Sequence, residues 1–227
     1  MLRRFVPALS FFYMRPDLAH VTTWLFDLDH TLYPFEANVM SLVEKRMSAF
    51  VARETGLPPE EAFQLQKRYL NEHGTTLAGL MKHHNVEPRR FLDEVHDVPL
   101  DDLHADHELN ALITALPGRK IVFTNGDEKH AVRLLNKLEM DSLFDGLFHL
   151  EHANYVPKPN LVTFELMMAA HLVSPRDTAF FEDSPRNLKP AHGLGMTTVL
   201  VGPHAAGNLD GFVDHRSPSL KAFLQSI

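Results

Sequence analysis

The chain has 227 residues, 44% hydrophobic and 22% charged, the composition of a folded globular protein with room for a core domain and an inserted one. It has no cysteine, which excludes disulfide bonds, thiolate zinc sites and a cysteine nucleophile and fits the reducing cytoplasm where we expect the protein. The formal net charge of −7 argues against a nucleic-acid polymer as a partner. It does not exclude a small anion, because a bound cation reverses the local field.

The first 14 residues carry two arginines and continue as an apolar run, the order found in a signal peptide. Pro7 interrupts this run, and Arg15-Pro16-Asp17 follows it without a small-residue cleavage site. The run is also too short to cross a bilayer. We expect an extension that the core does not need, and no contact with a membrane.

Residues 22–26 are mostly apolar and predict a buried strand, which ends at Asp27 and Asp29. Two like charges at a strand end are costly unless a cation lies between them or one carboxyl holds a proton. The pattern suits a metal ion and a nucleophile paired with a general acid. Taken alone, a strand that ends in solvated acids is an equally good interpretation.

Residues 35–99 contain no convincing strand and predict helices at 36–54, 60–71, 77–84 and 88–95. Gly56 and the pair Pro58-Pro59 end the first of these helices. We therefore predict an all-helical insertion at 36–99 and a core of residues 1–35 and 100–227. Such an insertion beside the acids can act as a lid that excludes water and selects the substrate.

Residues 120–124 predict a second buried strand, followed by a Thr124-Asn125-Gly126 turn and a helix over 128–138. A turn from strand to helix presents backbone N–H groups at a helix N-terminus, which favours a phosphate group. An ordinary strand–turn–helix remains the alternative.

Lys158 lies between two prolines, which hold it on a stiff, extended piece of chain. A fixed ammonium can neutralise charge on a phosphoryl group. Further on, a strand at 178–181 ends in Glu182 and Asp183, with Asn187 one helical turn beyond. Their oxygens are ligands suited to Mg²⁺, although an acidic helix start would look the same.

Strands are predicted at 22–26, 120–124, 147–150, 178–181 and 197–201, with helices between several of them, including 128–138 and 161–172. This alternation indicates an α/β fold with a parallel sheet covered on both faces. Because the carboxyl ends of parallel strands meet at one edge, the three polar groups above should meet there.

In this order the motifs resemble those of the haloacid dehalogenase superfamily of phosphohydrolases. The resemblance runs from about residue 22 to residue 201, and it matches four motifs at Asp27/Asp29/Thr31, Thr124, Lys158 and Glu182/Asp183. It implies a Rossmann-like core with a helical cap after the first motif, and Mg²⁺-dependent hydrolysis of a small phosphate ester.

The resemblance implies that Asp27 is the nucleophile and forms an aspartyl-phosphate. Asp29 would protonate the leaving alkoxide and then activate water, so we expect Asp29 to be protonated when the substrate arrives. A halide leaves without a proton, so the acid at position 29 favours C–O–P over C–halogen chemistry.

The expected Mg²⁺ ligands are Asp27, the backbone carbonyl of Asp29, and Asp183. Glu182 and Asn187 are secondary candidates, as ligands or as groups that act through water; many relatives have Asp where Asn187 stands.

Thr124 is expected to hydrogen-bond a phosphoryl oxygen, with help from N–H groups around Asn125 and Gly126. Lys158 would offset charge on the phosphoryl group and on the nucleophile. Thr31 would fix the loop that carries both acids.

Segments 32–34, 69–80, 143–147 and 181–184 resemble the pyrimidine 5′-nucleotidase branch of the superfamily, which implies UMP- or CMP-like substrates. Tyr33, Tyr69 and His73 are candidate substrate contacts, with packing inside the cap as the alternative for each. No residue visibly recognises a pyrimidine ring.

Two enzymatic alternatives remain: a phosphatase for another small ester (a sugar phosphate, phosphoglycolate or a ribityl-pyrimidine phosphate) and a phosphomutase. A non-catalytic binding or regulatory module is disfavoured, because a retired site would have lost one of the motif residues Asp27, Asp29, Thr124, Lys158 and Asp183. The sequence does not indicate an oligomeric state.

Overall fold

The structure is a computed structural model that describes residues 15–227. The expectation for the N-terminal extension therefore lies outside the described residues for positions 1–14. Within 15–227, no helix has both the length and the apolar character needed to cross a membrane.

Six parallel strands form one sheet in the order β3-β2-β1-β4-β5-β6. Their bounds are β1 Thr23–Phe26, β2 Arg119–Phe123, β3 Gly146–Phe148, β4 Thr178–Glu182, β5 Thr197–Val201 and β6 His215–Ser217. The five predicted strands are all present, which confirms the α/β class and the Rossmann-like core. Strand β6 was not predicted, because its three residues are His, Arg and Ser and carry no apolar run.

The register aligns the strand ends that carry the polar motifs. Phe26 at the end of β1 lies beside Val122 of β2 on one side and Phe181 of β4 on the other. The chain therefore leaves all three strands at the same edge of the sheet, next to one another.

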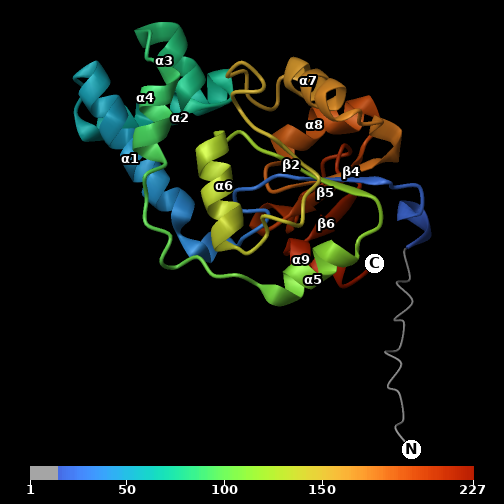
Figure 1. Ribbon diagram of the computed structural model, residues 1–227. Helices are drawn as coiled ribbons and strands as arrows, with labels where there is room; N and C mark the ends of the chain where they lie inside the picture. Colours follow the sequence, from blue (N-terminus) through green and yellow to red (C-terminus); the bar gives the residue numbers. More distant parts are fainter. Residues whose placement is uncertain (1–14) are drawn as a thin grey trace, which may run out of the picture.

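Helices cover both faces of the sheet (Figure 1). One face packs against α5 His107–Ala115, α6 Glu128–Lys137 and α9 Leu220–Leu224. The other packs against α7 Leu161–His171 and α8 Pro185–Leu194. No pattern in the sequence predicted α5 or α9, whereas α8 begins where a helix start was the alternative interpretation of the acidic segment. Four short 3-10 helices complete the described chain at Pro16–Leu18, Phe35–Ala37, Pro175–Asp177 and Pro203–Ala205.

Of the α-helices between β1 and β2, the first four stand together at one end of the sheet (Figure 1). They are α1 Val39–Thr55, α2 Pro59–His73, α3 Thr76–His84 and α4 Pro88–Val95. Gly56 ends α1 with a φ of 72°, a left-handed conformation that glycine adopts without strain. The group has its own aromatic contact, since the rings of Phe50 and Phe91 meet edge to face at 5.0 Å.

Candidate active site

Asp27 and Lys158 form a buried ion pair at the carboxyl edge of the sheet. Asp27 follows β1 directly, and its N–H donates to the carbonyl of Phe181 at 2.9 Å. The Lys158 ammonium donates at 2.8 Å to Asp27 Oδ1, to Glu182 Oε2 and to the carbonyl of Phe123. Lys158 is only 1% exposed, so its three protons and its charge are all matched by partners.

Three acids lie around this lysine. One carboxylate oxygen each from Asp27, Glu182 and Asp183 lies within 4.8 Å of the others, the sole such group found in residues 15–227. Burial and the charge of Glu182 raise the pKa of Asp27 to about 7, against the effect of Lys158. Burial and the charges of Glu182 and Asp27 raise the pKa of Asp183 to about 10. One ammonium does not balance three buried acids, so this set of hard oxygen donors fits a divalent cation.

Asp29 has a different environment. Its Oδ1 accepts hydrogen bonds from the Tyr33 hydroxyl at 2.5 Å and from His130 Nε2 at 3.0 Å. Burial raises the pKa of Asp29, but the charge and hydrogen bond of His130 and the hydrogen bond of Tyr33 outweigh it and hold this pKa well below its usual range. This environment favours the ionised form of Asp29, contrary to the expectation that Asp29 is protonated when the substrate arrives. Both bonds go to Oδ1, which leaves Oδ2 free of them.

A line of polar side chains behind Asp29 was missed by the sequence analysis. The ring of His130 stacks on His96 at a centroid distance of 4.0 Å, and His96 Nδ1 lies 2.7 Å from Asp127 Oδ1. Asp127 also caps α6 by accepting from the His130 N–H. The sequence did contain one signal for His130, because this residue lies in the first turn of α6, the helix that follows the polar end of β2. His96 belongs to a distant segment, and its side chain offered no signal of its own.

The turn after β2 is fixed by its own side chains. Gly126 donates its N–H to Thr124 Oγ1 at 2.9 Å, so this N–H is already engaged. Asn125 Oδ1 accepts the Lys158 N–H at 2.8 Å, and Asn125 Nδ2 donates to the Lys158 carbonyl at 3.2 Å. The side chain of Asn125 thus ties the turn to the lysine segment, a role that the sequence analysis did not give it.

A cavity of about 260 Å³ lies between the sheet edge and the helices α1 and α2. The core contributes a polar set of lining residues that includes Asp27, Asp29, Thr124, Asn125, Gly126, Lys158, Glu182, Asp183 and Asn187. The helices contribute a more apolar set that includes Met40, Met47, Gln66 and Leu70. Arg186 of α8 donates to the carbonyl of Leu70 at 3.1 Å and connects the two parts. The structure thus brings together the residues expected to bind the phosphate and the metal.

The three residues expected to contact the substrate do not line this cavity. Tyr69 places its hydroxyl 2.8 Å from His84 Nε2 and stacks on His83, and His73 Nε2 lies 3.1 Å from His83 Nε2. Tyr69 lies about 100° around the helix from Leu70, which does line the cavity. Packing inside the helical group, the alternative for both residues, matches this geometry. Tyr33 instead contacts Asp29 from the other side of the loop.

Thr31 is 4% exposed, and its hydroxyl has no hydrogen-bond partner within the described chain. The loop is held instead by backbone bonds, since the N–H groups of Thr31 and Leu32 both donate to the carbonyl of Leu28. Thr31 therefore belongs to the loop, but its side chain is not what fixes it.

A family model of haloacid dehalogenase-like hydrolases matches residues 21–195, about three quarters of the chain. The protein is thus a hydrolase by its fold and by this match. The chain belongs to the haloacid dehalogenase-like hydrolase family.

Among curated proteins, the chain is similar to Phosphate metabolism protein 8 of Saccharomyces cerevisiae, with 29% identity over 203 residues. The match covers 82% of this chain and 62% of the yeast protein, so the chain spans less than two thirds of the length of that relative.

Solved structures share the fold. A haloacid dehalogenase-type phosphatase from Thermococcus onnurineus aligns with a TM-score of 0.61 at 17% identity, covering 91% of this chain and 97% of that one. L-2-haloacid dehalogenase from Xanthobacter autotrophicus aligns with a TM-score of 0.56 at 15% identity, and the match covers 90% of this chain and 97% of the dehalogenase. The magnesium-bound hydrolase YfnB from Bacillus subtilis aligns with a TM-score of 0.57 at 17% identity, and the match covers 91% of this chain and 98% of YfnB.

Proposed function

We propose that this hydrolase is a Mg²⁺-dependent phosphomonoesterase in which Asp27 attacks the phosphorus atom of a small phosphate ester. The observation that carries the proposal is the buried group of Asp27, Lys158, Glu182 and Asp183 at one edge of the sheet. A carboxylate beside an ammonium and two further acids provides a nucleophile, charge compensation and metal ligands in one place.

In this mechanism the Asp27 carboxylate forms a bond to phosphorus while the bond from phosphorus to the ester oxygen breaks. Asp29 gives the departing oxygen its proton and then takes a proton from the water that hydrolyses the aspartyl-phosphate. The arriving phosphate dianion raises the pKa of Asp29, which counteracts His130 and Tyr33. Because those two groups hold Oδ1, the Oδ2 atom remains for the proton.

Asp27, Asp183 and the carbonyl of Asp29 would hold the cation, with Glu182 and Asn187 beside them. When bound, Mg²⁺ supplies positive charge that stabilises the phosphoryl oxygens. Lys158 holds Asp27 in place and compensates its charge until the phosphoryl group arrives. Thr124 lies in the same cavity as a hydrogen-bond partner for the phosphoryl group.

We propose a pyrimidine nucleoside 5′-monophosphate as the substrate and the helices α1–α4 as the cap that selects it, with 36–99 as its limits. Support comes from the apolar Met47 and Leu70 beside a buried amide in the cavity wall. Gln66 is 3% exposed, and within residues 15–227 its amide N–H₂ has the sulfur of Met47, at 3.8 Å, as its only hydrogen-bond acceptor. A base carbonyl would give this N–H₂ a better acceptor.

The test is phosphate release from UMP, CMP, AMP, ribose 5-phosphate and p-nitrophenyl phosphate by the purified protein with Mg²⁺. We expect the highest kcat/KM for UMP and CMP. Equal values across the five esters would overturn the pyrimidine assignment and leave the phosphatase. No release from any ester beyond that of the Asp27→Asn variant would overturn the phosphatase as well.

A further inference from the structure

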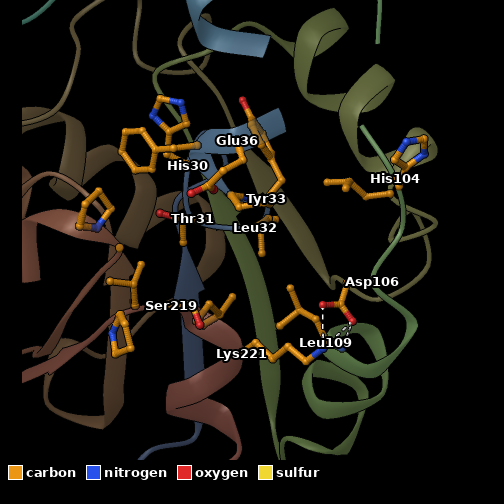
Figure 2. Close-up of a pocket in the computed structure, with 18 residues that line it drawn as sticks. His30, Thr31, Leu32, Tyr33, Glu36, His104, Asp106, Leu109, Ser219 and Lys221 are labelled. Carbon is orange, nitrogen blue, oxygen red and sulfur yellow. Dashed lines mark hydrogen bonds and ion pairs between the residues drawn. The ribbon is translucent and has the colours of Figure 1, made fainter. Parts of the chain in front are cut away.

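A second cavity lies on the opposite side of residues 30–36, the loop that follows the two motif acids. Its volume is about 400 Å³, larger than the 260 Å³ of the candidate active site. Figure 2 shows that residues of this loop, of the segment before α5 and of α9 surround it. Its buried walls are mostly apolar and include Leu32, Leu109, Leu138, Val201 and Leu220. A cavity of this size and lining can take a small organic molecule.

The charges at this cavity do not suit an anion. Glu36 and Asp106 line it, and within residues 15–227 Glu36 takes part in no ion pair. The lining cation Lys221 is already engaged, with its Nζ 2.9 Å from Asp106 and 2.7 Å from Glu108. Asp106 also accepts from Lys221 and from the N–H groups of Glu108 and Leu109, so Glu36 is the lining acid that remains without an ion pair in residues 15–227. The lining also contains His30 and His104. The unpaired carboxylate of Glu36 disfavours phosphate esters and favours a cation.

One buried polar atom in the wall lacks a partner. The Thr31 hydroxyl is buried without a hydrogen bond in the described chain, and Thr31 lines this cavity. Leaving such a group unsatisfied costs about 1–3 kcal/mol.

From these observations we propose that the cavity behind residues 30–36 binds a small organic monoamine, with its apolar body against the leucines and its ammonium toward Glu36 and Asp106. The inference differs from the proposed function because the two cavities have opposite preferences for charge. A phosphate ester belongs to one of them and a protonated amine to the other.

The loop between the cavities connects them physically. The ring of Tyr33 lines the second cavity, while its hydroxyl donates to Asp29 Oδ1 at 2.5 Å. His30 lines both cavities, and Phe35 stacks on it with ring centroids 3.6 Å apart. An occupant therefore touches side chains that also contact the candidate active site. This consequence rests on the proposed function: if the site hydrolyses phosphate esters, the amine changes its rate.

Binding is tested first, without reference to activity, with 2-phenylethylamine, 2-phenylethanol and phenylacetate as probes of one shape and three charges. Titration calorimetry of the full chain at pH 8 and low ionic strength should give about five-fold tighter binding for the amine than for the alcohol, and the weakest binding for the carboxylate. Equal binding of amine and carboxylate, or binding of none of the three, would overturn the proposal.

Two variants locate the binding. Glu36→Gln, at an exposed position, should remove most of the preference for the amine over the alcohol, whereas the matched change Glu60→Gln on α2 should not. Leu109→Phe puts a bulkier ring into the cavity wall and should weaken binding of all three probes. If Glu36→Gln leaves amine affinity unchanged, the assignment is wrong even where Leu109→Phe fails to fold.

The second readout is the effect of saturating 2-phenylethylamine on hydrolysis of p-nitrophenyl phosphate. We expect kcat to change at least about two-fold with KM nearly constant, and a smaller change in the Leu109→Phe variant. Amine binding without any phosphatase activity in the parent would leave the site in place and overturn the proposed function instead. Binding with unchanged kcat in an active parent would overturn the connection through Tyr33.

Discussion

The two cavities on either side of residues 30–36 share a wall and differ in nearly everything else. The cavity toward the sheet edge is lined by five acids and a buried lysine, and the other cavity is lined by leucines together with Glu36 and Asp106. The difference shows that a single short loop can separate a cavity lined mainly by charged side chains from one lined mainly by apolar side chains. Asp29, just before the loop, lines the first cavity, and Tyr33, within the loop, lines the second. The two side chains are nevertheless joined by a hydrogen bond. The following predictions, from the largest effect to the smallest, test this division.

Asp27→Asn should produce the largest effect and confine it to the charged cavity. We expect kcat for UMP to fall by about 10⁴-fold or more, because the amide is a poor nucleophile. The melting temperature should stay within a few degrees, since Lys158 keeps Glu182 as a partner and one of three mutually repelling acids is lost. Kinetics and thermal unfolding of the same sample check both parts. A large drop in melting temperature with activity retained would contradict the assignment.

Mg²⁺ should stabilise the folded protein by compensating the same acids. At a concentration about 100 times its dissociation constant, the gain is about 2.7 kcal/mol, seen as a higher melting temperature that EDTA reverses. Asp183→Asn should reduce the shift, whereas Asp210→Asn, far along the chain from the acid group, should keep it. A shift of the same size in both variants would place the ion elsewhere.

Tyr33→Phe separates the two faces of the loop. The change removes one of the two hydrogen bonds that orient Asp29 Oδ1. The pKa of Asp29 then rises toward its usual value, but the loss of orientation should lower kcat about ten-fold with KM nearly unchanged. The phenyl ring still lines the apolar cavity, so binding of 2-phenylethylamine should remain within about two-fold of the parent. Loss of both properties together would mean that the change disturbs the loop as a whole.

Gln66→Met should give the smallest effect, on substrate choice alone. Removing one neutral hydrogen bond should lower kcat/KM for UMP by about five-fold and leave p-nitrophenyl phosphate unaffected. Gln64→Met, at an exposed position of the same helix, is the matched control. Equal losses for both esters would show that Gln66 supports the helix and does not contact the base.

The parts of the fold that follow from local patterns could be predicted from the sequence. Runs of apolar residues predicted the buried strands, and apolar residues at helical spacing predicted the helices of the insertion. The polar strand ends could be expected to meet at one edge of the sheet. Strand β6 could not, because three polar residues at the margin of the sheet depend on pairing with β5. Helix α8 contains Pro190, which weakens any helical pattern.

The residues of the site could be predicted where their position in a motif shows their role. Properties that depend on side chains from distant parts of the sequence could not. Asp27 and Asp183 follow from the strand ends, and Lys158 from its place between two prolines. The low pKa of Asp29 depends on His130, a hundred residues away in sequence, and no pattern near Asp29 announces that contact. The orientation of Tyr69 and His73 depends on which face α2 turns toward the core, and that is decided by packing.

The hydrogen bonds of Asn125 have a consequence for the chemical ageing of the protein. Asn followed by Gly is the sequence most prone to deamidation, which begins when the next backbone nitrogen attacks the side-chain amide. Here both ends of that amide are held by the backbone of Lys158, and the Gly126 nitrogen points its hydrogen at Thr124. The fold thus shields a labile dipeptide for as long as it stays closed, and old or heat-stressed samples should acquire an aspartate there only after this turn opens.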